Sequence, residues 1–398
     1  MSIILRKKLS CPENLIYIAF ASTFLPYLLT GIVMVVLGIY ILCTHHNRQL
    51  VFSHIGSKLL ILFTIYTSLI ALIRDNFIGF ACSLGFFLVF VISYYTRSEI
   101  NGDIFQKSLD ISCWMSIVVF ISAFFEKLVM SHDKDYRCVG WFFNSNYLCT
   151  MMAMMVVVCV YKIIVSPKGK PFYCLTAICC AATMYLGGSI FAIVEVIVGI
   201  LTLLLLYKKH SVLATFLTIM GIAMLALYIF PELFPRILHS NASTEQRILV
   251  WDSSLEFIKI NPLLGNGFLS YYHLQGIYGS LWKTAHTHNF LFEPILSFGI
   301  IGSLIFLVFL WSYYQKVSEC KSLLRRQKAT NLILAISTAV IIHCTVDLTV
   351  MWIQTGLFFV LILAGIGVDE KALNRRIKAC LARSKNSQIT SEEETNNG

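Results

Sequence analysis

Two histidines lie close together in this chain, directly before a long apolar segment. They belong to the run His286-Thr-His288-Asn289. An imidazole changes its protonation state near neutral pH, so histidine is the residue type best suited to take up a proton during a reaction. Arg247 lies upstream, and a guanidinium offers an anionic group a permanent charge and paired donors. Each residue also has a plainer explanation, since histidines occur at membrane interfaces and arginines on solvated helices.

Composition indicates which solvent surrounds these residues. Of the 398 residues, 57% are hydrophobic and only 13% are charged, whereas a soluble globular chain is about a quarter charged. So few charges do not cover a surface of this size in water, and we expect lipid to surround most of the chain. A bilayer helix needs about 20 apolar residues. This length predicts an all-α polytopic membrane protein with about 12 transmembrane helices, near residues 13–26, 28–44, 58–74, 77–95, 108–129, 147–164, 172–187, 189–207, 212–230, 289–313, 330–347 and 350–367.

The basic residues predict the orientation of these segments, because Lys and Arg gather in cytoplasmic loops. If the N-terminus is cytoplasmic, eight of the 31 Lys and Arg residues fall outside: Arg74, Lys127, Lys134, Arg137, Arg236, Arg247, Lys259 and Lys283. Both termini are then cytoplasmic. The net charge of +10 is spread over short inside loops, so we expect a lipid bilayer, and no nucleic acid, as partner. The first helix is expected to serve as an uncleaved signal.

This orientation divides the chain into four parts. Residues 1–230 hold spans one to nine, and residues 289–367 hold spans ten to twelve. Between them, residues 231–288 form a large extracytoplasmic loop, the only outside segment long enough to cap the bilayer with a soluble layer. A shorter outside loop covers about 130–146. Residues 368–398 form a cytoplasmic tail that begins basic and amphipathic, and its last fifteen residues are expected to be disordered.

The large loop has the pattern of an amphipathic helix followed by a turn. Apolar residues recur at helical spacing over 248–258, and Ser243 is a fitting N-cap before them. Asn261-Pro262 predicts the end of this helix, and Gly265-Asn266-Gly267 predicts a turn. We therefore expect a mostly helical loop.

The 13 cysteines predict neither a disulfide framework nor a metal site. Most lie within apolar segments, where buried thiols behave as small hydrophobic groups. No Cys and His spacing is typical of a metal site, so we expect no metal.

Ionisable residues inside apolar segments are costly, and a functional role is the default expectation for them. Glu195 lies within the predicted eighth span, and His343 and Asp347 lie at the outer end of the eleventh. Glu195 either pairs with a polar group that faces inward or lies nearer to the interface.

Several motifs, taken together, resemble those of a known family. They are His288-Asn289, nine residues and Gly299-Ile-Ile-Gly302; Arg247-x-x-x-Trp251; Asn261-Pro262-Leu263-x-Gly265-x-Gly267; and, in the shorter loop, Arg137-x-x-Gly140 followed by Asn146. This set resembles the bacterial O-antigen ligase and O-antigen polymerase family. The motifs fall within about 130–310, and the predicted topology of the whole chain is similar to that of the family.

The resemblance implies a fold like that of the type C membrane glycosyltransferases, and a reaction. Family members transfer a glycan from an undecaprenyl-diphosphate carrier to a sugar hydroxyl, with inversion and without a cofactor. It implies His288 as the general base and Arg247 as the cation that stabilises the leaving diphosphate. The implied substrate-binding candidates are Arg137, Arg236, Arg74, Asn289 and Trp251. Gly299 and Gly302 are expected to let the tenth span pack closely on a neighbour.

The chain departs from the family at one position. Many members carry an arginine after a small residue where this chain has Gly188-Ser189-Ile190. If that arginine binds the pyrophosphate, its work falls to another cation here, such as Arg74 or Arg137.

The leading predicted function is a polymerase of lipid-linked repeat units of an O-antigen, capsule or exopolysaccharide in the bacterial inner membrane. The undecaprenyl-diphosphate-linked glycan is its substrate partner, with a flippase and a chain-length regulator as further expected partners. The first alternative is an O-antigen ligase that transfers the glycan to the lipid A core of lipopolysaccharide. A second alternative is a polysaccharide transporter or flippase, although the large loop is unexpected there and no paired broken helices are evident. A protein oligosaccharyltransferase is a third, but such proteins are commonly longer.

Overall fold

The structure is a computed structural model that describes residues 11–133, 136–230, 240–324 and 327–396. Within these ranges every regular element is a helix, and there is no strand. The prediction of an all-helical fold is therefore confirmed. Among the predicted site residues, Arg236 lies outside the described residues.

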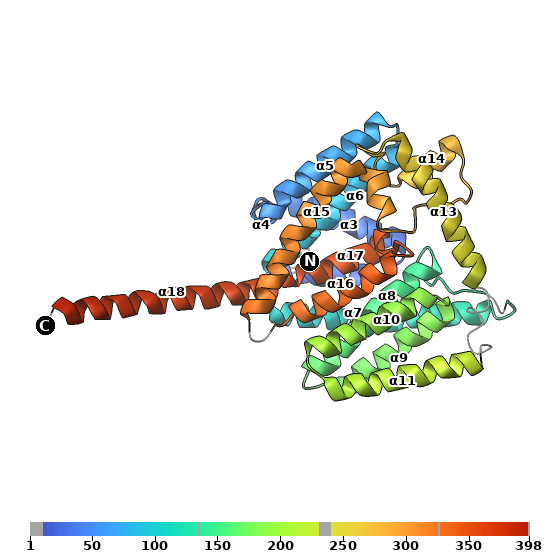
Figure 1. Cartoon of the computed structure of the whole chain (residues 1–398). Helices are drawn as coiled ribbons and strands as arrows, with labels where there is room; N and C mark the ends of the chain where they lie inside the picture. The colour runs from blue at the N-terminus through green and yellow to red at the C-terminus, as the bar shows by residue number, and fades with distance from the viewer. Residues whose placement is uncertain (1–10, 134–135, 231–239, 325–326, 397–398) are drawn as a thin grey trace, which may run out of the picture.

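Most helices form one bundle (Figure 1). Its most enclosed member is α8 (Ser145–Val165), which has 78% of its most apolar stretch buried and packs against α9 and α10. The other bundle helices are α2 (Pro12–Ser22), α3 (Tyr27–Cys43), α4 (His45–Phe52), α5 (Ile55–Ile73), α6 (Phe77–Glu99), α7 (Gly102–Val129), α9 (Lys170–Gly187), α10 (Ile190–Leu206), α11 (His210–Ile229), α15 (Phe292–Leu323), α16 (Thr330–Cys344) and α17 (Ile353–Ala364), with the short 3-10 helix η2 (Thr349–Met351) before α17.

Each predicted span coincides with a helix, which supports a multi-pass membrane protein, but the number of twelve spans stays a prediction. Among the described residues, five helices are long and apolar enough to cross a bilayer alone: α5, α6, α7, α8 and α15. The number is six if α3 and α4 form one bent span. Helices such as α2, with 11 residues, rise only about 17 Å, against a hydrocarbon core of about 30 Å.

Two predicted breaks between spans are confirmed. The first lies between α2 and α3, where Pro26 directly precedes α3. The second lies between α9 and α10, where Gly188 has a φ of +62°. Glycine adopts this left-handed conformation without a steric penalty. The sequence did not predict α4, which follows α3 after a bend of 95°.

The large loop contains α13 (Ser240–Ile260) and α14 (Ser270–Tyr278), so the expectation of a mostly helical loop is confirmed. α13 ends directly before Asn261-Pro262, as predicted. Its start differs from the prediction, because the helix already begins at Ser240. Ser243 therefore lies inside α13, and its assignment as the N-cap is wrong. The apolar pattern that located the helix begins only at Ile248, after the first two turns.

A break inside α15 receives the turn that follows α13. Gly299 has φ +62° and ψ −175°, which interrupts the helix. The backbone amides of Ile300 and Ile301 donate to the carbonyls of Pro262 and Leu263, at 2.9 and 3.1 Å. The loop thus supplies hydrogen-bond partners for the amides that the break in the helix leaves without one. A membrane protein tolerates non-helical backbone where its polar groups are satisfied within the protein. Any side chain at 299 would collide with the Leu263 backbone, which explains the glycine.

Asparagine side chains fasten the same turn to the first half of the chain. Asn76, at the start of α6, donates to the carbonyls of Asn266 and Phe268 at 3.0 and 2.8 Å. Arg74, at the end of α5, donates to the side-chain oxygen of Asn261. Asn261 in turn donates to Asn266 at 2.7 Å. The turn therefore has a fixed place between the α5–α6 hairpin and α15.

The other end of the bundle is fastened by α18 (Ile366–Asn396), which leaves the bundle at the end opposite to α13 and α14 (Figure 1). The buried Asp369 carboxylate accepts hydrogen bonds from the backbone amides of Lys328, Ala329 and Thr330, at 2.8, 3.0 and 2.8 Å. It thereby caps the start of α16. The helix continues to Asn396, so the prediction of a disordered end of the tail is wrong.

Replacement of the Asp369 cap is expected to destabilise the protein. Asp369→Asn removes the charge that three amides and the Thr330 hydroxyl share, at an expected cost of about 1–3 kcal/mol. The midpoint of thermal unfolding of the purified protein in detergent should therefore fall. Glu319→Gln is the control, because Glu319 forms an exposed ion pair with Lys316, and such pairs contribute little. Equal midpoints for the two variants would show that the cap does not hold this end together.

Candidate active site

The centre of the site is the turn at the end of α16, formed by residues 343–347. Four groups on this turn, three backbone carbonyls and one carboxylate, form hydrogen bonds with the residues around them. The carbonyl of Cys344 accepts from the Phe290 amide at 2.9 Å, and the carbonyl of Thr345 accepts from the Asn289 side chain at 3.1 Å. The remaining two groups are the Val346 carbonyl and the Asp347 carboxylate.

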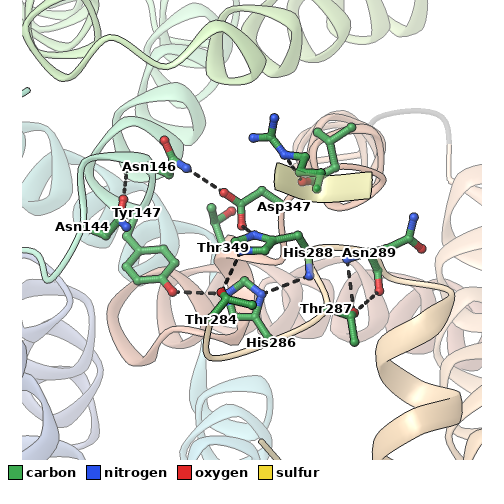
Figure 2. A network of polar contacts seen from close by, with 12 residues as sticks. Asn144, Asn146, Tyr147, Thr284, His286, Thr287, His288, Asn289, Asp347 and Thr349 are labelled. Atoms are coloured by element: carbon green, nitrogen blue, oxygen red, sulfur yellow. Dashed lines mark hydrogen bonds and ion pairs between the residues drawn. The ribbon is translucent and has the colours of Figure 1, made fainter. Parts of the chain in front are cut away.

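The buried Asp347 carboxylate joins His288 to the short loop (Figure 2). Its Oδ1 lies 2.9 Å from His288 Nδ1, and its Oδ2 accepts from the Asn146 amide at 2.7 Å. Asn146 lies in the first turn of α8, where its backbone N–H donates to the capping side chain of Asn144. One carboxylate thus links α8, the end of α16 and the end of the large loop.

This contact determines which nitrogen of His288 is free to act as a base. An ionised carboxylate only accepts hydrogen bonds, so Nδ1 must carry the proton. Nε2 then presents its lone pair, and it accepts a hydrogen bond from the Thr284 hydroxyl at 2.9 Å. The arrangement matches an imidazole that a carboxylate orients for proton uptake from a hydroxyl. The His288 side chain is 24% exposed, so a hydroxyl group of a substrate can approach it.

Neighbouring imidazoles keep Asp347 in the ionised form. Burial alone would raise the pKa of its carboxyl, but His288, together with His286 and His343, outweighs this effect. The pKa of Asp347 therefore lies well below its usual value. The carboxylate stays charged at neutral pH and can hold His288 and Asn146 together.

His286 supports the backbone at His288 and is poorly suited to be the base. Its Nδ1 accepts the His288 N–H at 3.3 Å, and its Nε2 lies 3.3 Å from the Tyr147 hydroxyl, so both nitrogens are engaged. Burial, aided by the charge of His288, lowers the pKa of His286 to about 3. The imidazole is therefore neutral near pH 7.

His288 has a backbone conformation that is uncommon for residues other than glycine. Its φ is +56°, in the left-handed region, which costs of the order of 1 kcal/mol or more for a residue with a Cβ. The amide of the preceding Thr287 donates to the buried Glu293 at 2.8 Å, and the His286 ring holds the next amide. These contacts fix the strained turn that aims His288 at Asp347.

Arg247 extends from α13 to the same turn. Its Nε donates to the Val346 carbonyl at 2.9 Å, and its guanidinium lies over the Phe191 ring, 5.1 Å from the centroid. The structure thus brings Arg247 to the residue next to Asp347, and the cation lies beside the His288 network.

Arg137 is connected to Asp347 through Asn146. Its terminal amine donates to the side-chain oxygen of Asn146 at 2.7 Å, and its Nε donates to the Gly187 carbonyl at 2.9 Å. It therefore lies against the bend that precedes Ile190, where many family members carry an arginine. A chain of hydrogen bonds runs from Arg137 through Asn146 and Asp347 to His288.

Three other predicted residues have different settings. Asn289 donates to the Thr345 carbonyl and accepts the Leu291 amide at 2.8 Å, so it shapes the start of α15. Trp251 packs edge-on against Phe292, with ring centroids 6.3 Å apart. Arg74 is held by Asn261 on the turn, and none of its described contacts is with the His288 network. Their predicted part in substrate binding stays a prediction.

Within the described chain, His286, His288 and Asp347 also form a group that could hold a metal ion. One ligand atom from each lies within 4.8 Å of the others. His288 and Asp347 contact each other at hydrogen-bond distance, so a metal would have to replace that bond. The expectation that the site works without a metal stays a prediction.

Sequence reasoning missed the roles of Asp347, Thr284 and Tyr147. A signal existed for Asp347, because an acidic residue at the end of an apolar segment is costly unless it has a partner. Nothing in the sequence pairs it with His288, since the two are 59 positions apart. Asn146 formed part of a motif, but the motif did not indicate its contact with Asp347.

Two comparisons with known proteins show what parts of the chain resemble. Residues 175–307 match a family model described as O-antigen ligase, and the matched segment includes Arg247 and His288. Asn146 and Asp347 lie outside it. A stretch of 100 residues is 27% identical to a protein of Rickettsia felis that bears the name "Putative polysaccharide ligase"; it covers 23% of this chain and 25% of that protein. The resemblance predicted from the motifs is confirmed, since residues 175–307 match the O-antigen ligase model.

Proposed function

We propose that this protein is a membrane glycosyltransferase that transfers a glycan from undecaprenyl diphosphate to a sugar hydroxyl. The observation that carries the proposal is the Asp347–His288 pair, with Arg247 beside it on the same turn. The match of the segment with Arg247 and His288 to the O-antigen ligase model supports the same reaction class.

In the proposed reaction, the acceptor hydroxyl takes the place of the Thr284 hydroxyl at His288 Nε2. Its oxygen attacks C1 of the donor sugar while its proton passes to Nε2. The bond between C1 and the diphosphate oxygen breaks, and undecaprenyl diphosphate leaves. Attack on the face opposite to the leaving group inverts the anomeric centre. Asp347 orients the ring and stabilises the imidazolium that forms, as in carboxylate–histidine pairs generally.

Two arginines near Asp347 fit the charge that develops on the diphosphate. A guanidinium offers two parallel donors to phosphate oxygens. Arg247 uses Nε for the Val346 carbonyl, which fixes the side chain and directs its terminal amines. Arg137 contacts the bend that precedes Ile190. We assign to Arg137 the binding of the pyrophosphate, in place of the arginine that many family members carry at that position. The large loop, folded as helices and docked on α15, favours this enzyme over the transporter alternative.

The identity of the acceptor decides whether the enzyme is a ligase or a polymerase. The family description and the name of the Rickettsia felis protein both refer to ligases, which favours transfer to a lipid A core. The polymerase predicted from the sequence has the same donor and chemistry, with a second lipid-linked glycan as acceptor. In either case the site faces the outside of the bacterial inner membrane, and both termini are cytoplasmic.

The glycans of a deletion strain are expected to distinguish the two acceptors. Loss of a ligase leaves the lipid A core bare, and lipid-linked polymer accumulates. Loss of a polymerase leaves single repeat units on the acceptor. The measurement is gel separation and mass analysis of lipopolysaccharide and lipid-linked glycan, with a complemented strain as control. An unchanged glycan profile would contradict both forms of the proposal.

His288→Ala is expected to abolish transfer, since loss of a general base lowers rates by about 10²–10⁴-fold. The assay is complementation of the deletion strain, with the amount of protein in the membrane measured in parallel. His132→Ala is the matched control, because His132 is an exposed histidine of the short loop and should retain full activity. Normal glycan from a His288→Ala protein would rule out this residue as the base.

Arg247→Lys is expected to fail like Arg247→Ala, despite the conserved charge. A lysine lacks the planar fork, so it cannot bond the Val346 carbonyl and also donate two parallel hydrogen bonds to a diphosphate. Transfer should fall by at least about tenfold in both variants. Lys259→Ala serves as control, because Lys259 is an exposed cation on the same helix. Restoration of activity by lysine would show that only the positive charge matters.

A further inference from the structure

A second carboxylate–histidine pair lies behind the site and takes no part in the proposed reaction. Glu195 of α10 and His343 of α16 meet with Oε2 and Nδ1 2.7 Å apart. The exposed fractions of the two residues are 0% and 1%. The other carboxyl oxygen of Glu195 is buried and has no hydrogen-bond partner among the described residues.

A buried pair of ionisable groups joins two apolar helices only at a cost in desolvation free energy. Two ionisable groups lose their hydration when they are buried, and apolar side chains of similar volume often give equal or higher stability. The same two helices also meet through Thr202 and Thr338, whose hydroxyls are 3.1 Å apart. Helix packing alone therefore does not account for Glu195 and His343. Their place in the chain suggests what they do.

His343 is the first residue of the 343–347 turn. Its backbone carbonyl accepts the amides of Val346 and Asp347, each at 3.0 Å. These two residues hold Arg247 and His288. A shift or rotation of His343 thus moves both the carbonyl that fixes Arg247 and the carboxylate that orients His288. The His343 side chain, held by Glu195, is the anchor of the turn on α10.

We propose that Glu195 and His343 are positioning residues for glycan transfer: their buried contact fixes the end of α16 so that Asp347 stays on His288 and Val346 on Arg247. This inference rests on the proposed function. Neither residue touches the substrate. Their effect on the reaction passes through the 343–347 turn, and a displacement of about 1 Å in such a support can lower a rate by about 100-fold.

The decisive variant replaces the pair by apolar residues, Glu195→Leu with His343→Leu. Because no charge is left unpaired, the protein should insert and keep its thermal midpoint. Glycan transfer per amount of membrane protein is nevertheless expected to fall by at least about tenfold, since leucines do not fix the rotation of the turn. Thr202→Val with Thr338→Val, on the same two helices but away from the turn, is the matched control and should transfer normally. Full transfer by a stable Leu/Leu protein would overturn the proposal.

Coupling to Asp347 separates positioning from a general structural effect. Because the pair acts partly through Asp347, the Leu/Leu change should add less than its full loss to that caused by Asp347→Asn, whereas independent effects would multiply in full. Multiplied losses would therefore count against the proposal. His288→Ala, measured in the same strain, tests the proposed function separately. If His288→Ala transfers normally, the reaction assignment fails; if it is inactive and Leu/Leu is fully active, only the positioning role fails.

A conservative variant keeps the test decisive if the Leu/Leu protein does not fold. Glu195→Gln retains an oxygen that accepts from His343 Nδ1 in a side chain of the same shape. It should transfer within about twofold of the original protein, because the position of the turn is preserved. A tenfold loss in a stably inserted Gln variant would show that the charge or proton of Glu195, and not its contact, is required.

Discussion

The candidate site depends on one buried carboxylate that two partners share. Asp347 holds His288 with one oxygen and Asn146 with the other. Isolated in an apolar environment, this charge would be strongly unfavourable. With both oxygens engaged it is stable, and removal of either partner would leave a buried charge partly unsatisfied. The carboxylate therefore ties three segments far apart in the sequence, and it sets the tautomer that gives His288 a basic nitrogen.

The broken helix α15 gives this carboxylate a fixed surrounding. At Gly299 the helical ladder stops, and the loop turn after α13 supplies the missing partners. The loop is thus attached to the bundle by main-chain hydrogen bonds at its central turn, and by Arg247 before and His288 after that turn. Arg74 belongs to this attachment, since it holds Asn261. The glycine motif and the histidine motif have separate places in the structure: one docks the loop, and the other contains the proposed base.

Much of this arrangement could be predicted from the sequence, but its centre could not. The apolar segments located the helices, because each helix presents a continuous apolar surface to lipid or to its neighbours. The motifs located Arg247 and His288. The start of α13 was misplaced because its first turns lack apolar residues. The last fifteen residues of the tail were predicted as disordered from their polarity, yet the helix that Asp369 docks on α16 continues to Asn396. Asp347 itself was recognised only as a costly charge, since pairing across many positions requires the packed fold.

The turn that carries Asp347 also explains why a motif does not reveal it. Residues 344, 345 and 346 bind the rest of the site through their backbone carbonyls, which any residue type supplies. Only the ends of the turn need particular side chains: His343, which reaches α10, and Asp347, which reaches His288. The geometry of such a turn is fixed, but the sequence between His343 and Asp347 shows little pattern. The function of the site therefore depends on how firmly α16 is held, at one end by Asp369 and at the other by Glu195.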